Sequence, residues 1–430
     1  MAAVLYTCIP MYVAPLPALH LAPRPLVATM MTATQQAPAT AALEMVEPVT
    51  AHEDDDELSL VLDRATAFRP MNDVNIILPF NPSSSWLWQQ YKGTILEVTW
   101  KPTLYLMLKS ALLVWAVRAS GYWTWPLLAV PDPSHPIVMR LKSIDVMWNY
   151  LLTLATFVSS FFVSQAYPFW RGTLSNTRKI QGRFGDFNLL LAGHALRAKQ
   201  VGSKGENEGM VFTPKAHAYL TETARLSRLA HILFWASVVR KARGDFFKGS
   251  LSLLSTDIGL KGLEERGEIS STSDERKLLE AIPPGSRHHI VFGWMMDKFQ
   301  TARDEGLIGG GNGLEGQVLQ QLTGLRGTCA SINDDLAAPM PLAYVHFVQI
   351  MTDVVLLLAP FALFPRLGAL SILLSGILGL FYRGLLELSK SFLDPFGNEG
   401  SIGQNLVIDC LMGEVNAGSV RWVEGGARMP

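Results

Sequence analysis

The chain has 430 residues, of which 49% are hydrophobic and only 17% are charged. Soluble domains usually carry about 25% charged residues, so this composition argues against a purely soluble enzyme. The formal net charge of −1 also argues against a general nucleic-acid binder, which would be strongly basic. The three cysteines, Cys8, Cys329 and Cys410, exclude a disulfide scaffold and a structural zinc site by their number and spacing.

Residues 1–90 are predicted to form an N-terminal leader and an acidic linker. Residues 1–43 lack Asp and Glu and are rich in Ala, Pro, Thr and Met, which is typical of an organelle-targeting peptide, although a disordered N-terminus fits equally well. The five acidic residues from Glu53 to Glu57 are interpreted as a solvated linker, because unspaced carboxylates in a mobile segment repel one another.

Apolar stretches predict four membrane crossings, at residues 99–117, 146–170, 336–364 and 367–388. The second is the clearest, because its 25 residues contain no charge and a hydrocarbon core takes roughly 20 residues of helix. The last two form a helical hairpin that breaks at Pro365 and Arg366. In the first, Lys109 must snorkel, face the protein interior or help to bind an anion.

The polar section 171–335 lies between two predicted membrane segments, 91–170 and 336–412, and residues 413–430 form a tail. We expect this section to be a soluble helical bundle. Its first half, 171–248, holds fourteen Lys or Arg against five Asp or Glu. This excess predicts a positive potential that concentrates anions, with a merely solvated basic face as the alternative.

No residue constellation points to an enzyme, a metal or a cofactor. His288 and His289 are adjacent and project to different faces of a helix or strand, so with Asp297 they make a poor metal site. Cys329 lies beside Arg326 and has no evident partner base, so we interpret it as a buried thiol.

The second apolar stretch carries a stripe of side chains at helical spacing. Thr153, Phe157 and Phe161 recur every four residues and therefore share one helix face. In a monomer this face would be core. If several copies surround an axis, the phenylalanines form rings that exclude water and turn their positive edges toward an anion. Asn149, one turn earlier, would offer an amide donor at the mouth.

Several separated stretches resemble the bestrophins and their plant, algal and bacterial relatives. The resemblance covers about residues 92–412, and its motifs are weak singly but specific in their order. They are Leu278-Leu-Glu-Ala-Ile-Pro283, Ala302-Arg-Asp-Glu-Gly306, Leu325-Arg-Gly-Thr-Cys329, Pro339-Met-Pro-Leu-Ala-Tyr344 and Asp394-Pro-Phe-Gly397.

The resemblance implies an all-α membrane protein, a homopentamer in which each subunit gives four membrane helices and a large soluble helical bundle. Thr153, Phe157 and Phe161 fall where the family's three pore-neck rings lie. A second constriction, the inner aperture, maps by counting back from Cys329 to Gly313, with Leu314 beside it. A glycine there would leave the aperture wide, and a leucine would make a hydrophobic gate.

The family's calcium clasp uses an acidic run after its Asn-Pro-Phe-Gly motif. In this chain Asp394 replaces the asparagine, and of the residues that follow, among them Asn398 and Glu399, only Glu399 is a carboxylate. Calcium prefers six to eight oxygen ligands, so we expect that it does not gate this protein. A steep micromolar calcium dependence of the current would contradict this expectation.

The leading hypothesis is a passive channel for chloride, with bicarbonate or nitrate as further candidates, whose partners are its own copies, inorganic anions and the lipid bilayer. The alternatives are a non-conducting membrane adaptor that docks partners through its soluble bundle and coupled transport, for which Lys109 and Asp353 are the only intramembrane relay candidates. The leader and the plant and algal resemblance favour the chloroplast thylakoid, with the plasma membrane as the fallback.

Overall fold

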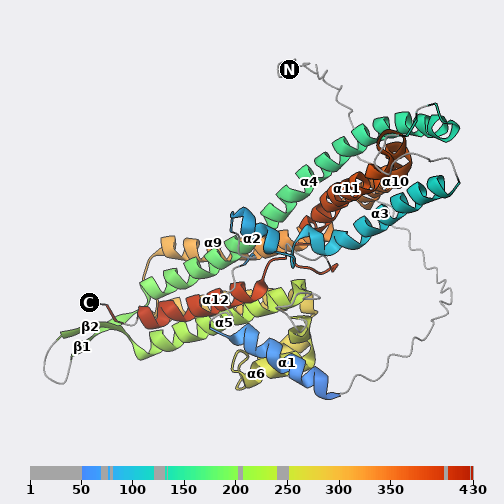
Figure 1. Cartoon of the computed structure of the whole chain (residues 1–430). Coiled ribbons are helices and arrows are strands. Elements are labelled where there is room, and N and C mark those ends of the chain that lie inside the picture. The colour runs from blue at the N-terminus through green and yellow to red at the C-terminus, as the bar shows by residue number, and fades with distance from the viewer. Residues whose placement is uncertain are drawn as a thin grey trace, which may run out of the picture. The chain divides into compact units, whose positions relative to one another are not determined.

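The computed structural model describes residues 51–68, 76–77, 81–120, 131–132, 134–201, 207–239, 251–400, 405–426 and 428–429. All of them belong to one compact unit, Thr50–Pro430. The predicted targeting leader, residues 1–43, lies outside the described residues. Most of the described chain is helical, and the helices form two bundles that share one long helix (Figure 1).

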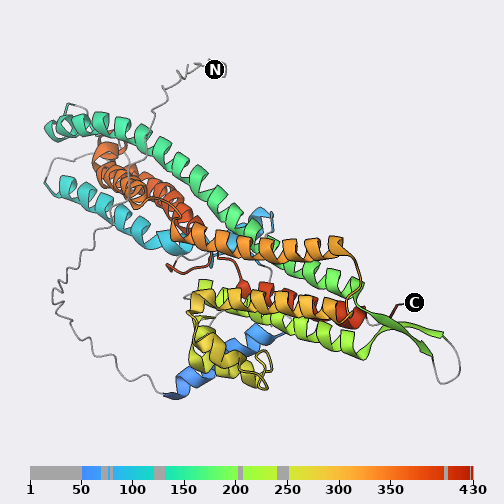
Figure 2. The same ribbon diagram turned by 180° about the vertical axis from the view of Figure 1, so that it is seen from behind.

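The first bundle, here called the apolar bundle, contains α3 (Ile95–Ala119), the first half of α4 (Pro136–His194), α10 (Leu342–Leu367) and α11 (Ser371–Phe392). Both α10 and α11 contact α3 on one side and α4 on the other (Figures 1 and 2). Among the described residues, two stretches are long and apolar enough to cross a membrane, Pro136–His194 and Leu342–Phe392. The second of these holds both α10 and α11, whereas α3, which carries Lys109, is not among them.

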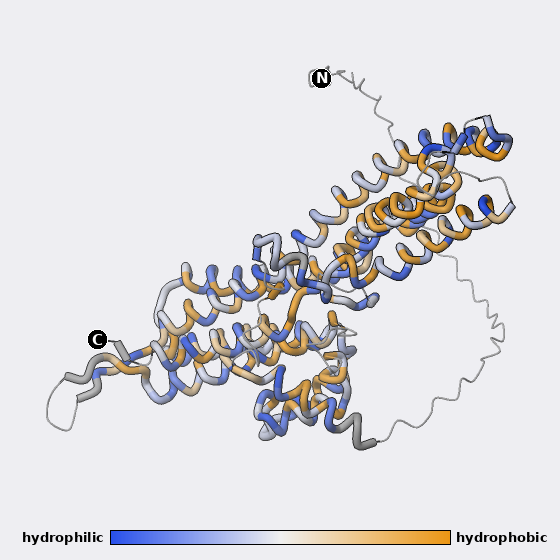
Figure 3. Tube along the Cα trace, in the orientation of Figure 1, coloured by the Kyte–Doolittle hydropathy of each residue, from blue (hydrophilic) through white to orange (hydrophobic). Residues whose placement is uncertain are grey.

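The second bundle, here called the polar bundle, combines the second half of α4 with helices from the middle and end of the chain. These are α1 (Ala51–Thr66), α5 (Pro214–Val238), α6 (Asp257–Glu265), α7 (Glu275–Glu280), α8 (Arg287–Asp304), α9 (Asn312–Ala337), α12 (Ile408–Gly425) and the short 3-10 helices Leu251–Ser255 and Pro284–Ser286. Its central helix is α5, which is buried along most of its length. The polar bundle mixes blue and orange residues along each helix, whereas hydrophobic residues predominate in α10 and α11 (Figure 3). A further short helix, α2 (Ser84–Gln89), precedes α3.

The long helix α4 extends 24 residues beyond Trp170, the end of the predicted span, and reaches His194. Its continuation is amphipathic: Ile180, Phe184, Phe187 and Leu191 recur at helical spacing and are buried in the polar bundle. Arg171, the charged residue that ends the apolar stretch, therefore marks where α4 passes from the apolar bundle to the polar bundle, and the helix does not end there.

Two expectations about the connecting segments are wrong. The acidic run Glu53–Glu57 is not a linker but the beginning of α1, which forms because Val61, Leu62 and Ala65 pack on one face into the polar bundle. The hairpin does not break at Pro365, which lies inside the last turns of α10. The turn comes at the 3-10 helix Gly368–Leu370, where Gly368 adopts a positive φ of 54° that favours glycine.

The expectation of an all-α chain holds for both bundles but misses a small antiparallel sheet of order β1-β2-β3. Its strands are β1 (Arg197–Val201), β2 (Asn207–Phe212) and β3 (Arg428–Met429). Arg197 pairs with Phe212 in register, and its guanidinium lies 4.3 Å from the centroid of the Phe212 ring. The β-hairpin of β1 and β2 thus begins directly after the end of α4.

Candidate pore neck

The buried face of α4 fixes how this helix is turned in the apolar bundle. Trp148 Nε1 donates a hydrogen bond of 2.8 Å to the backbone oxygen of Val355 on α10. About two turns further along α4, Thr156 hydrogen-bonds the Tyr382 hydroxyl of α11. The Phe162 ring then meets Tyr344 edge to face, with centroids 5.7 Å apart. Successive contacts on α10 and α11 thereby hold one face of α4 inward.

The opposite face carries the predicted neck residues, here called the neck stripe: Thr153, Phe157 and Phe161. The Phe157 side chain is 69% exposed and that of Phe161 is 48% exposed. Their rings are nearly parallel, at 13°, with centroids 6.5 Å apart. Thr153 is also exposed, and its hydroxyl donates to the backbone oxygen of Asn149 over 3.1 Å. The protomer therefore does not use this stripe as its core.

Polar residues accompany the neck stripe on the exposed side of α4. Ser160, Ser164 and Gln165 are exposed there. By contrast, the large exposed side chains in the middle of α3 are mainly apolar, namely Leu104, Tyr105, Leu108, Leu112 and Trp115. Lipid-facing surfaces avoid polar side chains, and water-lined or protein-covered surfaces accept them. The outer surface of α3 fits lipid, whereas that of α4 is mixed, because Tyr150 and Leu154 are exposed there beside the polar residues.

The side chain of Asn149, the predicted donor at the mouth, contacts Asp145 within α4. Its side-chain amide donates to the backbone oxygen of Asp145 over 2.9 Å and lies 3.3 Å from the Asp145 carboxylate. That carboxylate is buried and forms an ion pair with Arg366, with Nη2 and Oδ2 2.7 Å apart. Asn149 therefore supports a link between α4 and the end of α10, and at least one of its amide hydrogens is not offered to the mouth.

The two residues assigned to the inner aperture lie in the first turn of α9, near the far end of α4. Gly313 is exposed, whereas Leu314 is buried in the core of the polar bundle. The adjoining loop is tied to α4 because the Gly309 amide donates to the His194 oxygen over 2.7 Å. At 1.5 Å per residue, His194 lies roughly 50 Å along α4 from Phe161. Of the two, only Gly313 is free to line an opening.

The region that matches the calcium clasp is held by its own hydrogen bonds. Asp394 is buried, and its Oδ2 accepts a hydrogen bond of 3.0 Å from the backbone amide of Glu399. The Asn398 side chain donates to the backbone oxygen of Val238 over 2.9 Å. The Glu399 side chain is exposed. One buried carboxylate that caps a turn does not resemble the multidentate oxygen cage that calcium prefers.

Part of the basic excess between residues 171 and 248 is neutralised inside the polar bundle. Arg225 pairs with Glu222 at 2.7 Å and with Glu275 at 2.8 Å, and Arg228 pairs with Glu268 at 2.9 Å. Burial raises the pKa of Glu268 even though Arg228 opposes the shift. These arginines stabilise the bundle. Any field that attracts anions must come from exposed bases such as Arg171 and Lys179.

Of the residues considered for metal binding or nucleophilic chemistry, His288 and Cys329 are buried, His289 is half-buried and Asp297 is exposed. His288 and His289 have ring centroids 4.0 Å apart, and burial lowers the pKa of His288 to about 3. Cys329 is fully buried, which raises the pKa of its thiol to about 12 and keeps it protonated. In the part of the chain that the structure describes, no group of three His, Cys, Asp or Glu side chains is placed to hold a metal ion.

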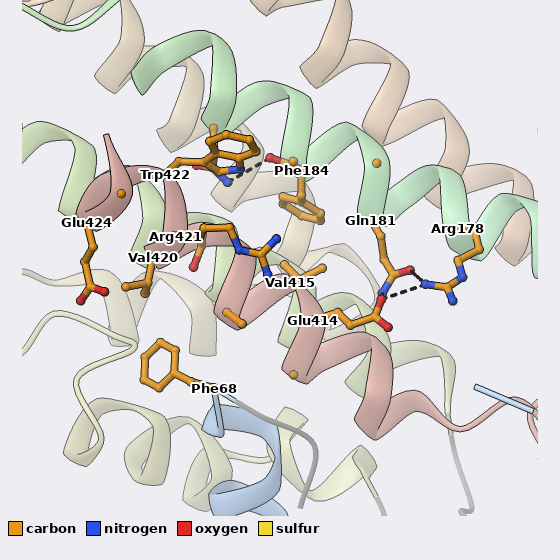
Figure 4. Close-up of a pocket in the computed structure, with 18 residues that line it drawn as sticks. Phe68, Arg178, Gln181, Phe184, Glu414, Val415, Val420, Arg421, Trp422 and Glu424 are labelled. Atoms are coloured by element: carbon orange, nitrogen blue, oxygen red, sulfur yellow. Dashed lines mark hydrogen bonds and ion pairs between the residues drawn. The ribbon is translucent and has the colours of Figure 1, made fainter. Parts of the chain in front are cut away.

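Two hollows were not foreseen from the sequence. The larger, about 1110 Å³, is a groove between α4 and α12 whose walls include Gly182, Gly185 and Gly418 (Figure 4). At one end Arg178 and Glu414 neutralise each other at 2.8 Å, so this end offers no unpaired charge to an ion.

The smaller hollow, about 250 Å³, lies between α3, α10 and α11 and is lined by Lys109, Asp353 and Arg383. These side chains come together only because α3 packs against the hairpin of α10 and α11, which is distant from it in sequence.

Comparison with solved structures identifies the fold. Point mutants of a bacterial bestrophin homologue from Klebsiella pneumoniae match with TM-scores of 0.53 and 0.52, each at 12% sequence identity. The first match covers 76% of this chain and 98% of the other, and the second covers 75% and 98%. No family model and no curated protein matches the sequence. The chain therefore has a bestrophin-like fold, as its motifs predicted.

Proposed function

We propose that this chain is a multi-pass membrane protein that forms a homopentameric anion channel. Chloride is the principal proposed ion, with bicarbonate and nitrate as further candidates. In this proposal α3, α4, α10 and α11 cross the membrane, and five copies of α4 surround the pore. Thr153, Phe157 and Phe161 form the neck, and Gly313 lies at the inner aperture.

The observation that carries the proposal is the exposed neck stripe on a helix of a bestrophin-like fold. The bare protomer leaves Phe157 and Phe161 uncovered while it buries the other side of α4. Serine and glutamine share that exposed side with Tyr150 and Leu154, so it is more polar than the outer surface of α3. Rings of phenylalanine around an axis would exclude water and present positive ring edges to a partly dehydrated anion.

The proposal is tested with purified protein in liposomes and planar bilayers. We expect chloride flux from the natural sequence, and the double variant Phe157→Ala, Phe161→Ala is expected to raise conductance and weaken discrimination among anions because the neck widens. Phe381→Ala is the matched control, since Phe381 is about as exposed as Phe161 but lies on α11. Unchanged permeability ratios in the double variant contradict the neck assignment. Absence of any flux from the natural sequence contradicts conduction and favours the adaptor role.

The proposed location is the chloroplast thylakoid membrane, with the plasma membrane as the alternative. It depends on the composition of residues 1–43, which contain no acidic residue. Expression of the full chain with a C-terminal fluorescent tag, compared with a chain that lacks residues 1–43, tests this location. Targeting that does not depend on the leader contradicts it.

A further inference from the structure

The pocket between α3, α10 and α11, here called the lateral pocket, combines charge with an apolar lining. Lys109 comes from α3, Asp353 from α10 and Arg383 from α11. The remaining lining residues are Pro102, Tyr105, Leu106, Leu356, Leu357 and Gly379. Since α10 and α11 contact both α3 and α4, the pocket lies on the side of these helices that faces α3 and is separate from the neck stripe.

The three charged residues lie near the middle of the apolar bundle. Counted from the helix ends next to the polar bundle, Lys109 is 14 residues along α3, Asp353 is 11 along α10 and Arg383 is 9 along α11. At 1.5 Å per residue these positions are about 14–21 Å deep. A charged side chain at mid-membrane costs about 2.5–3.5 kcal/mol on insertion scales, so an uncompensated charge here needs a counter-ion.

Asp353 is already compensated by neighbours on its own side of the pocket. Its Oδ1 lies 2.6 Å from Nη2 of Arg383, and its Oδ2 accepts a hydrogen bond of 2.8 Å from Gln349. A guanidinium has five N–H donors, so the contact with Asp353 leaves Arg383 with further donors. The charges of the Asp353 carboxylate and the Arg383 guanidinium therefore cancel, and Arg383 keeps N–H donors that can bind another acceptor.

Lys109 is the charge that remains. Its Nζ lies 4.3 Å from the centroid of the Tyr105 ring, and among the described residues no ion pair joins it to a carboxylate. A cation over an aromatic face gains about 0.5–2 kcal/mol, which is less than the cost of a lone ammonium in the membrane. The lateral pocket thus has a net charge of +1 from Lys109, Arg383 and Asp353.

We propose that the lateral pocket binds a carboxylate-type monoanion between the Lys109 ammonium and the remaining donors of Arg383. A planar oxyanion suits a guanidinium better than a spherical halide does, because two of its oxygens can accept from the fork. This chemistry is shared by a small free anion and by the acid group of a fatty acid. Leu357, which lines the pocket, is exposed and offers an apolar surface for an acyl chain. The inference rests on the proposed membrane insertion and not on conduction.

The experiment measures ligand-induced stabilisation of the full-length purified protein in detergent. Acetate replaces chloride stepwise at constant ionic strength, and decanoate is added separately below its micelle-forming range. A ligand that binds the folded state raises the unfolding temperature saturably. We expect this rise for the natural sequence, and we expect Lys109→Gln to abolish it. Lys101→Gln is the matched control, since Lys101 is exposed on the same helix and does not line the pocket.

The arms distinguish the sources of the anion. A Lys109-dependent response to acetate assigns the site to a small free anion, and a Lys109-dependent response to decanoate alone assigns it to a lipid-borne carboxylate. Lys109→Met, which suits an apolar environment, is a second loss variant should Lys109→Gln fold poorly. An equal response in the natural sequence and in either loss variant overturns the inference. This experiment measures unfolding temperature and not ion flux. A negative result here therefore does not contradict the channel proposal, and a failure of the flux experiment does not contradict anion binding in the lateral pocket.

Discussion

His288 shows how far a single residue of the polar bundle departs from its behaviour in water. Its side chain is fully buried, and neither ring nitrogen has a hydrogen-bond partner among the described residues. The rings of Phe234 and Phe292 lie at centroid distances of 5.3 and 5.8 Å. Burial lowers its pKa from 6.5 to about 3, so the folded protein holds this imidazole neutral at any physiological pH.

This burial predicts acid sensitivity that the substitution His288→Phe removes in part. Between pH 6.5 and about 3 the unfolded chain binds a proton at His288 and the folded chain does not, so stability falls as the pH falls through this window. At pH 5 the deficit is about 2 kcal/mol. We expect His288→Phe to raise the unfolding temperature at pH 5 relative to the natural sequence by clearly more than at pH 8.

His217→Phe is the control for that measurement, because it makes the same substitution at a histidine that is exposed on α5. The additional gain at pH 5 is expected only from the substitution of the buried His288. An equal shift of the unfolding temperature at pH 5 and pH 8 for His288→Phe would show that His288 is not held neutral in the folded state.

At the scale of elements, the ion pair between Asp145 and Arg366 joins the first turns of α4 to the end of α10. The Asp145 side chain is 9% exposed and that of Arg366 is 54% exposed, with 2.7 Å between the charged atoms. Removal of one partner from a fully buried pair costs about 3–5 kcal/mol, and the exposure of Arg366 lowers the expected cost to roughly 1–3 kcal/mol. Arg366→Gln should therefore lower the unfolding temperature.

A double-mutant cycle measures how strongly the two residues are coupled. We expect the double variant Asp145→Asn, Arg366→Gln to lose less stability than the sum of the two single variants, because it leaves no buried charge without a partner. The exposed pair of Arg178 and Glu414, 51% and 49% exposed, is the matched control and should couple by less than about 1 kcal/mol. Additive losses at Asp145 and Arg366 would mean that this pair does not join the helices.

The elements also show what the sequence determines and what it leaves to packing. The charge-free stretch 146–170 and the spacing of Phe157 and Phe161 predict an apolar helix with an aromatic stripe, and the structure has both. The turn at Gly368 could not be predicted, because Pro365 is the stronger breaker in the sequence but is tolerated in the last turns of α10. The lateral pocket could not be predicted either, since it depends on how α3 packs against the distant hairpin of α10 and α11.

At the scale of the whole molecule, α4 is the one described element that belongs to both bundles. Its first half presents the neck stripe, and its second half packs against α5, α9 and α12. Because α4 is one continuous helix from Pro136 to His194, with Pro168 between its two halves, it connects the neck stripe to the polar bundle. Any symmetry in the packing of the polar bundles would therefore be imposed on the neck.

Fivefold symmetry makes a distance prediction that other assemblies do not share. Spin labels on a ring of five identical positions give two distances in a ratio of about 1.6, the diagonal to the side of a regular pentagon, whereas a tetramer gives about 1.4 and a dimer gives one distance. Ser164→Cys, on the exposed side of α4, should show the pentagonal pair of distances at short range in pulsed dipolar spectroscopy.

The labelling is selective once Cys8 is replaced by serine, because Cys329 and Cys410 are buried. The control label, Leu373→Cys, lies on the exposed surface of α11 and should give the same ratio at longer distances, since α11 would stand outside the ring of α4 helices. Longer distances from Ser164 than from Leu373 would place the neck stripe at the periphery. In that case Phe157 and Phe161 face lipid, and the adaptor role becomes the better account of this fold.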